Sequence, residues 1–347
     1  MVHGAWRRLR ADRVAMVSLA VVVAFLLMVV LSASGLIVAD WEEEVGVNYA
    51  PPSFVGGAAT TPAPSVRQQA LPDNPFDPIA EDIRALRSGV DMYGVVDPLA
   101  DDLAQLRAQA GEGGAAAVAR RATLPFGGDK WGHDVIKKTI KGGETSIVVG
   151  LVAAFVAVAL GTLFGALSGY CGGVVDDFFN WFYSIFTAIP SVLMILAVAA
   201  VLQQKGVLTI VLILGLTGWT GPYRLIRAEY LKHKAREYVL AADAIGASHW
   251  RKMFGHIFPN VSHVALVQMS ILVVGFIKAE VILSFLGFGV PVGVVSWGSM
   301  LNEAQNELIL GRWWQLTAAA VAMALLVTAF SLFTDALRDA LDPKVKA

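Results

Sequence analysis

The chain has 347 residues and a formal net charge of −1, and 56% of its residues are hydrophobic while only 16% are charged. Soluble domains carry about 25% charged residues on average, so this composition favours a protein that lies in lipid. The sequence has no basic patch with interleaved aromatic residues, which argues against nucleic acid as a partner. Its single cysteine, Cys171, excludes an internal disulfide framework and a CxxC metal site.

Six stretches of the chain are long and apolar enough, or nearly so, to cross a bilayer. A helical span requires about 20 mainly apolar residues, so the predicted fold class is an all-α integral membrane protein with six transmembrane helices. The first stretch is too long for a secretory signal and has no clear A-x-A cleavage site, so we interpret it as an anchor. The predicted spans are Val14–Val38, Ser146–Leu167, Phe178–Leu202, Val207–Tyr223, Val261–Ile277 running on toward Phe288, and Trp313–Thr334.

The distribution of lysine and arginine predicts the orientation of these spans. Four arginines precede the first span, which places the N-terminus in the cytoplasm. Alternation then places the C-terminus and the basic loop 224–260 inside, and the acid-rich segment after span one outside. The predicted organisation is a cytoplasmic N-terminus with the first span (1–39), an external, periplasmic segment (40–123), and a core of five helices (124–347) that includes the loop 224–260.

The external segment contains an internal repeat. Residues 77–87 and 97–107 match each other, and each copy begins with Asp-Pro, followed by acidic residues and an apolar stripe. Aspartate as N-cap, proline at the first helical position and acids in the first turn are typical of a helix start. We therefore expect two short amphipathic helices on the outer face, which serve either as a spacer packed on the protein or as a docking element.

The loop 224–260 has the sequence of a helix–turn–helix that projects from the membrane. Strong helix formers fill residues 235–244. Gly246 can adopt the left-handed conformation that turns the chain, Ser248 can cap a second helix, and Pro259 is expected to end that helix before the next span. The small side chains of the first helix would allow another protein to approach closely.

This stretch resembles the EAA loop of permease subunits of ATP-binding-cassette (ABC) importers, in the version found in dipeptide and oligopeptide importers. Three further segments are similar to the second permease of that family: two outer loops and the C-terminus. The matching loop residues are Glu237, Ala241, Ala242, Gly246, Ile257 and Pro259. The matching outer-loop residues are Asp129, Gly132, Asp134, Ser284, Gly287, Pro291, Trp297 and Gly298. The matching C-terminal residues are Asp335, Arg338, Asp342 and Pro343.

The sequence also departs from the family pattern. Gly128 and His133 stand where threonine and arginine are usual, and Trp181 and Ser184 stand where an arginine and an aspartate are usual. The second pair of departures puts in doubt a cytoplasmic ion pair that the family makes there. The long segment 40–123 has no role that the resemblance supplies.

The resemblance implies a permease that forms half of a translocation pathway for di- and oligopeptides in the bacterial inner membrane. Its implied partners are a second homologous permease, one or two ABC ATPase subunits, and a periplasmic or lipid-anchored substrate-binding protein. Glu237 would contact an ATPase and Gly246 would form the turn. The chain has no P-loop motif, so ATP and magnesium are expected on the partner ATPases, with no catalytic, cofactor or metal site in this chain.

Three alternatives remain open from the sequence. The same machine could carry nickel or another small solute, since no residue discriminates between cargoes. A self-sufficient channel would not need the loop, and a membrane enzyme would need a cluster of acids, histidines or cysteines at one depth.

Lys278 and Glu280, near the outer end of the fifth span, are either functional charges or an interfacial or inter-subunit pair.

Overall fold

The computed structural model describes residues 9–55 and 120–341. In this part of the chain every regular element is a helix, and the extended pairing consists of three isolated bridges, at Gly46–Arg121, Pro52–Leu124 and Gly128–Asp134. The predicted all-α class is thus confirmed for these residues. The repeated segment 77–107 and the C-terminal Asp342 and Pro343 lie outside the described residues.

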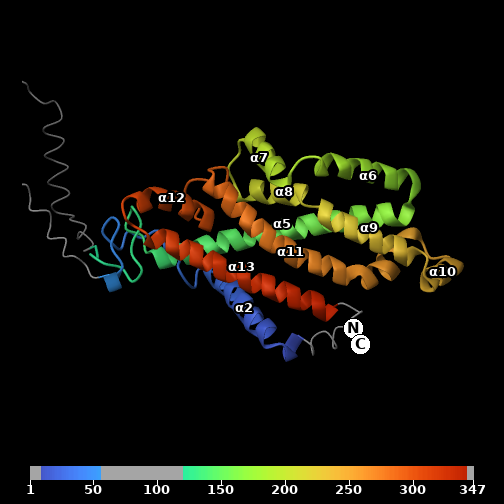
Figure 1. Cartoon of the computed structure of the whole chain (residues 1–347), viewed down its shortest axis with the longest axis horizontal. Coiled ribbons are helices and arrows are strands. Elements are labelled where there is room, and N and C mark those ends of the chain that lie inside the picture. The colour runs from blue at the N-terminus through green and yellow to red at the C-terminus, as the bar shows by residue number, and fades with distance from the viewer. Residues whose placement is uncertain (1–8, 56–119, 342–347) are drawn as a thin grey trace, which may run out of the picture.

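Figure 1 shows the helices in chain order. They are α2 (Arg13–Ala33), η1 (Ser53–Val55), α5 (Val135–Cys171), α6 (Gly173–Thr187), α7 (Ser191–Leu202), α8 (Val207–Thr217), α9 (Thr220–Lys234), α10 (Glu237–Ala244), η2 (Arg251–Ile257), α11 (Phe258–Phe285), α12 (Trp297–Ile309) and α13 (Trp314–Leu341).

Four described helices are long and apolar enough to cross a membrane: α2, α5, α11 together with η2, and α13. A fifth crossing is possible if α6 and α7 form one broken span. Together they are long and apolar enough to cross a membrane, although the chain bends by 84° between them. Pro190, which has no backbone N–H to continue the ladder, stands at that break as the N-cap of α7. The predicted span Val207–Tyr223 is divided between α8 and α9 at Gly218. The length and composition of the described helices thus show four spans, or five if α6 and α7 cross together, and the sixth span stays a prediction.

The longest helix, α5, packs closely against α9 along a row of glycines. Gly161, Gly165 and Gly169 recur every four residues and therefore lie on one face of α5. A Cβ atom at these positions would lie 2.7 to 2.8 Å from backbone carbonyl oxygens of α9. Only glycine permits this separation of the two helices, which is the close approach that small residues allow in membrane proteins.

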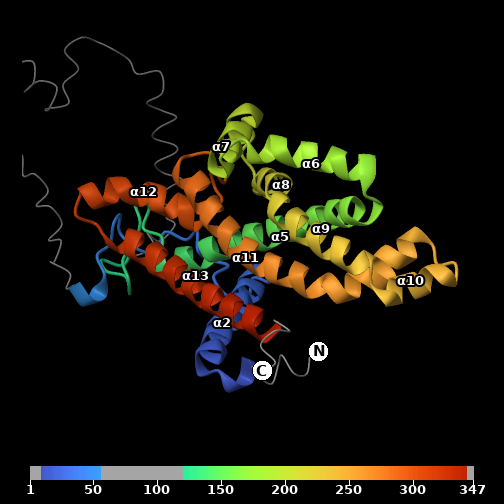
Figure 2. The same cartoon turned by 45° about the vertical axis from the view of Figure 1, so that its right-hand side comes forward.

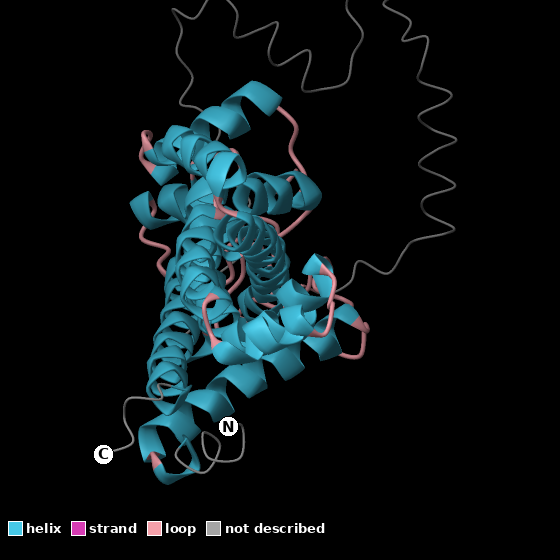
Figure 3. Cartoon of the chain, turned by 90° about the vertical axis from the view of Figure 1, so that its right-hand side faces the viewer, coloured by secondary structure: helices cyan, strands magenta, loops and turns pink. Residues whose placement is uncertain are grey.

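The two ends of the molecule carry different elements. The start of α2, the end of α13 and α10 lie toward one end, while α12 and the segments 40–55 and 120–134 lie toward the other (Figures 1 and 2). Figure 3 is seen from the side of α10. The predicted cytoplasmic and external parts that the structure describes are therefore separated along the long axis. Below, these are called the α10 end and the α12 end.

The two described edges of the external segment are joined by backbone hydrogen bonds. The amide of Gly46 donates to the carbonyl of Gly132 at 2.9 Å, and the amide of Tyr49 donates to the carbonyl of Asp129 at 2.8 Å. The described residues 40–55 and 120–134 therefore lie side by side at the α12 end.

Candidate functional site

The loop 224–260 forms a compact projection at the α10 end. Helix α9 extends to Lys234, and α10 begins at Glu237 after a short break. Gly246 has a φ of +77°, so the predicted left-handed turn is present, and a side chain there would be strained. The amide of Gly246 donates to the carbonyl of Asp243 at 2.9 Å, which closes the turn.

One face of α10 is anchored to the rest of the protein. Val239 and Ala242 are buried, and Val239 belongs to a hydrophobic cluster that includes Tyr230, Met253 and Ile257. The Tyr230 hydroxyl donates to the carbonyl of Met253 at 3.0 Å. Packed contacts of this kind fix the position of α10 relative to α9 and η2, so a displacement of α10 is transmitted to both.

Polar contacts add to this anchoring. The ammonium group of Lys252 donates to the carboxylate of Asp243, and this contact joins η2 to α10. The hydroxyl of Tyr170, at the end of α5, lies 3.0 Å from Nδ1 of His249. The Asp243 carboxyl has a pKa below its usual value, because it accepts the Lys252 hydrogen bond and lies beside that charge.

The opposite face of α10 and the turn that follows it are exposed, and they carry apolar side chains beside Glu237. Leu240 is 59% exposed, Ile245 is 83% exposed, and Trp250 is 61% exposed, and Ala241 is also exposed. Contiguous exposed apolar side chains mark protein–protein or membrane contacts more often than chance. These residues lie in the basic loop, and we call Leu240, Ala241, Ile245 and Trp250 the α10 tip.

The expectation that Pro259 ends a helix is wrong. The helix continues without interruption from Arg251 to Phe285, and Pro259 lies in the first turn of α11. The preceding segment η2 is a π-helix, and proline is tolerated in the first turn of α11 because it has no amide to pair there. Ser248 behaves as expected: its hydroxyl accepts from the amide of Arg251 at 3.4 Å.

An ion pair is present at the α10 end despite the departures at Trp181 and Ser184. The guanidinium of Arg227, on α9, donates two hydrogen bonds of 2.6 Å to the carboxylate of Asp176, on α6. The hydroxyl of Ser168 donates to the same carboxylate. This two-pronged contact joins α5, α6 and α9, and the geometry gives it more specificity than a single bond would have.

The residues predicted at the outer loops meet at the α12 end around Asp129. This side chain is fully buried, and its carboxylate accepts from the ammonium of Lys138 at 2.7 Å and lies 2.9 Å from Nδ1 of His133. The amides of Trp131 and His133 also donate to it, at 2.8 and 3.0 Å. Burial raises the pKa of Asp129, but these hydrogen bonds and the Lys138 charge outweigh burial and hold the pKa well below its usual range.

Lys138 extends this network to the helix α12. Its ammonium donates to Glu303 at 2.6 Å, and the side-chain amide of Gln315 donates to the same Glu303 oxygen at 3.2 Å. The motif residues Gly132 and Asp134 support the loop: Gly132 has a φ of +87°, and Asp134 caps α5 by accepting from the amide of Ile136 at 2.8 Å. The outer motif thus links the loop before α5 to α12 and α13.

The second outer motif converges on a buried carboxyl group, Glu280 of α11. The hydroxyls of Ser146 and Ser284 each donate to it at 2.6 Å. Ser146 in turn accepts from the amide of Trp297 at 3.2 Å, and a Cβ atom at Gly298 would lie 2.6 Å from the Ser284 Cβ. Among the described residues Glu280 makes no ion pair, and Lys278 is exposed, so the two charges do not pair with each other within this chain. Serine hydroxyls satisfy the carboxyl instead.

The remaining residues of this motif shape the loop after α11. Gly287 has a φ of +84°, and Pro291 is half-buried in the turn that follows.

The C-terminal motif lies at the opposite end of the molecule: Asp335 and Arg338 are exposed on α13. Arg338 lines a cavity of about 390 Å³ between α9, α11 and α13, together with Glu229, His263 and Gln268.

Glu307, on α12, is a buried carboxyl group that the sequence did not single out. It is 2% exposed, and neither carboxylate oxygen has a hydrogen-bond partner among the described residues. Burial raises its pKa to about 7, with Asp129 and Glu303 adding to the effect and Lys138 opposing it. The native protein therefore binds a proton at Glu307 that the unfolded chain releases above about pH 4.5.

We expect Glu307→Gln to stabilise the protein at pH 8 by up to about 3 kcal/mol and to leave it unchanged at pH 5. The raised pKa makes the wild type lose stability as the pH rises from about 4.5 through 7, and a neutral amide has no such loss. Thermal unfolding in detergent at both pH values measures the difference. A variant gain that is equal at pH 5 and pH 8 contradicts the assignment.

The described residues contain no group of three or more His, Cys, Asp or Glu side chains that could hold a metal ion. The functional residues that the structure brings together are instead packing and capping groups at two ends of a helical core.

Comparison with known protein families agrees with this arrangement. Residues 161–347 match the family described as the binding-protein-dependent transport system inner membrane component, and residues 1–52 match the N-terminal TM domain of oligopeptide transport permease C. The chain belongs to this family of inner membrane transport components. It is therefore a membrane permease subunit.

Several permeases of this family are similar to the chain over most of its core. It is 36% identical to the dipeptide transport system permease protein DppC of Bacillus subtilis over 221 residues, which are 64% of this chain and 69% of the relative. It is 37% identical to the oligopeptide transport system permease protein OppC of the same organism over 221 residues, 64% of this chain and 72% of the relative. It is 35% identical to the OppC protein of Haemophilus influenzae over 219 residues, 63% of this chain and 70% of the relative.

Besides Glu307, two features of this permease were missed by sequence reasoning. The apolar residues Leu240 and Ile245 of the α10 tip occur within the loop motif, but their exposure follows only from which neighbours, Val239 and Ala242, pack inward. The network of Lys138 with Glu303 joins residues far apart in the sequence. No local pattern in the sequence indicates this pairing.

Proposed function

We propose that this chain is one of two permease subunits of an ABC importer that moves di- and oligopeptides across the bacterial inner membrane. In this proposal it forms half of the translocation pathway and couples to ATPase subunits through the loop 224–260. A substrate-binding protein delivers the cargo to the α12 end. ATP and magnesium are bound by the ATPases, and this chain performs no hydrolysis.

The proposal includes six membrane crossings with both termini in the cytoplasm. Helices α6 and α7 together form one crossing, and α8 and α9 form the next, because α6 begins and α9 ends at the same end of the molecule (Figure 1). The helix break at Gly218 and the bend at Pro190 can lie inside the membrane where neighbouring helices cover the irregular backbone. The family match and the positive charge of the loop support this orientation.

The α10 tip is the observation that carries the coupling proposal. Its inner face is anchored to α9 and η2, while Leu240, Ala241 and Ile245 are exposed and apolar. An apolar helix face of this kind suits insertion into a groove on another protein. The anchoring would pass a movement of the ATPases to α9 and α11, and hence to the spans.

We expect Ile245→Glu to weaken the binding of ATPase subunits more than tenfold, because it places a charge at the centre of the apolar tip. The measurement is the amount of P-loop ATPase that co-purifies with a tagged chain from its native membrane. Ile309→Glu is the matched control, because Ile309 is 84% exposed, close to the 83% of Ile245, but lies on α12 at the opposite end.

The same purification tests the wider proposal. Recovery of a second permease with P-loop ATPases supports the importer, and peptide screening of the accompanying binding protein then tests the cargo. Equal ATPase recovery from both isoleucine variants contradicts the role of the α10 tip. Recovery of the wild-type chain alone, in detergent that preserves other complexes, contradicts the importer assignment as a whole.

A further inference from the structure

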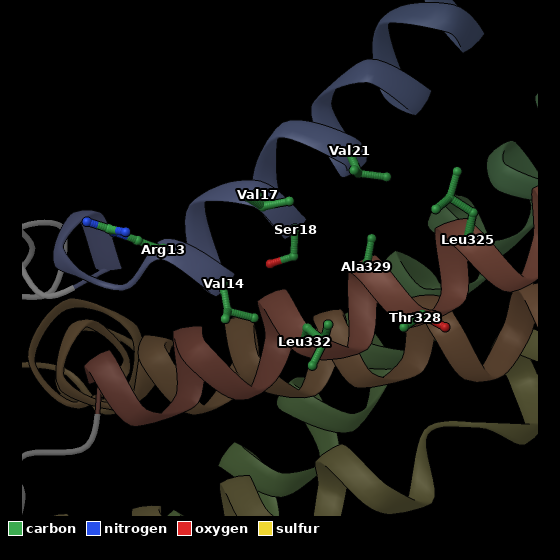
Figure 4. A pocket seen from close by; sticks show the side chains of 9 residues that line it. All are labelled: Arg13, Val14, Val17, Ser18, Val21, Leu325, Thr328, Ala329 and Leu332. Atoms are coloured by element: carbon green, nitrogen blue, oxygen red, sulfur yellow. The ribbon is translucent and has the colours of Figure 1, made fainter.

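A groove lies between the first turns of α2 and the second half of α13. Its volume is about 380 Å³, within the range of small-ligand sites. Figure 4 shows side chains of α2 along one wall, side chains of α13 along the other, and Arg13 at the beginning of α2. The groove is lined by Arg13, Val14, Val17, Ser18, Val21, Leu325, Thr328, Ala329 and Leu332.

The body of the groove is apolar. Val14, Val17 and Leu325 are each more than half exposed, so the walls are open to the surroundings of the protein. The hydroxyl of Ser18 donates to the carbonyl of Ala15 at 2.9 Å and is therefore satisfied within its own helix. The interior of the groove thus offers contacts to an apolar chain and little to a polar ligand.

The mouth of the groove is positively charged. Arg13 and Arg10 are exposed, and neither forms an ion pair with a described residue. The only acidic residue of this segment, Asp12, caps α2 by accepting from the amide of Val14 at 2.8 Å. On the facing helix, Asp335 and Asp339 lie beyond Leu332 and do not line the groove. The sequence adds Arg7 and Arg8 immediately before this segment.

We propose that this groove binds one acyl chain of an anionic phospholipid, with the lipid phosphate held by Arg13, which lines the groove, and attracted by the charge of Arg10, three residues earlier in the chain. The groove complements one lipid molecule: its apolar walls suit an acyl tail, and the arginines at its end suit a negatively charged phosphate. Basic residues beside a transmembrane helix attract anionic lipid headgroups, and the arginine fork suits a phosphate. The bound lipid would fill the space between α2 and α13 and hold α2 against the core.

The test uses the purified assembly that contains this chain, stripped of lipid and titrated with phosphatidylglycerol or phosphatidylcholine. Native mass spectrometry reports the lipids retained. We expect selective binding of phosphatidylglycerol, weakened about fivefold for each arginine removed and about 25-fold in Arg10→Gln/Arg13→Gln. Arg251→Gln, at the same end but outside the groove, is the matched control and should bind as the wild type does.

A second variant tests the acyl slot separately from the charge. Val17→Phe should reduce the retention of phosphatidylglycerol by filling the groove, and Val17 is exposed, so the fold should tolerate the larger side chain. Equal retention of both lipids, with no effect of the arginine or Val17 variants, overturns the proposal. A cross-link from a cysteine at position 17 to the second permease in the intact assembly also overturns it, because a protein then occupies the groove.

Discussion

Replacing Asp129 by asparagine should lower the free energy of unfolding by about 3 kcal/mol. The side chain is fully buried and accepts hydrogen bonds from Lys138, His133 and two backbone amides. Asparagine removes the charge that balances the buried ammonium of Lys138 and places an amide group where donors already converge. Glu303 continues to neutralise Lys138, so we expect a loss at the lower end of the range for broken buried ion pairs.

The effect should depend on pH in a defined direction. The folded pKa of Asp129 is held below its unfolded value, so the stabilisation is fully present above about pH 4 and is lost as the pH falls through the folded pKa. The contribution of the Asp129 carboxylate to the difference between wild type and variant should therefore decrease in acid, below about pH 4. Thermal or denaturant unfolding in detergent measures it.

Asp40→Asn is the matched control for this experiment. Asp40 pairs with Lys137 at 2.5 Å on the same end of the molecule, but its side chain is 47% exposed. An exposed pair contributes at most about 1 kcal/mol, so the control should lose far less. If the two variants lose similar amounts of unfolding free energy, burial is not what makes Asp129 important for stability.

Gly165→Leu should destabilise the protein by about 4 kcal/mol or more, the second large effect that we expect. A Cβ atom at position 165 would lie 2.8 Å from the carbonyl oxygen of Tyr223 and 3.0 Å from the amide nitrogen of Arg227. Both atoms belong to the backbone of α9 and cannot rotate away. The two helices must separate, which also breaks the contacts of Arg227 with Asp176.

The size of the side chain provides a graded version of this test. Gly165→Ala should cost about 1 to 3 kcal/mol, because it brings one methyl group against the same atoms. Gly275, inside α11, has nothing within 4 Å of a Cβ atom and is the matched control. There Gly275→Ala should gain up to about 1 kcal/mol of helix propensity. Effects of the same sign at both positions would falsify the close packing of α5 and α9.

The sequence predicted those features that depend on short stretches of chain. Apolar runs such as Val14–Val38 mark a span because each residue of a helix contributes its transfer free energy nearly independently. The turn at Gly246 follows from the freedom of glycine at positive φ. The close packing along α5 could be anticipated from small residues that recur at helical spacing. The sequence of the loop 224–260 also predicted the helix α10 and the turn that follows it.

Other features depend on groups that meet only in three dimensions. The number of spans is one of them, because whether α6 and α7 or α8 and α9 act as single crossings depends on how each broken pair packs. Pro259 is another: proline ends most helices, yet here it lies in the first turn of α11, where it has no amide to pair, and the helix continues through it. The surroundings of Glu280 are a third: the sequence left open a functional charge or a charged pair, and the fold surrounds its carboxyl with two serine hydroxyls.

The sequence alone therefore determined the class of this protein, its apolar segments and the family motifs, because these are properties of local composition and order. The tertiary structure decided which motif residues have a common role. It buried Asp129 and Glu280 in separate polar clusters and left Leu240 and Ile245 exposed at the tip of α10. Burial and hydrogen bonding depend on neighbours distant in the chain, and no local pattern encodes which face of a short helix will be covered.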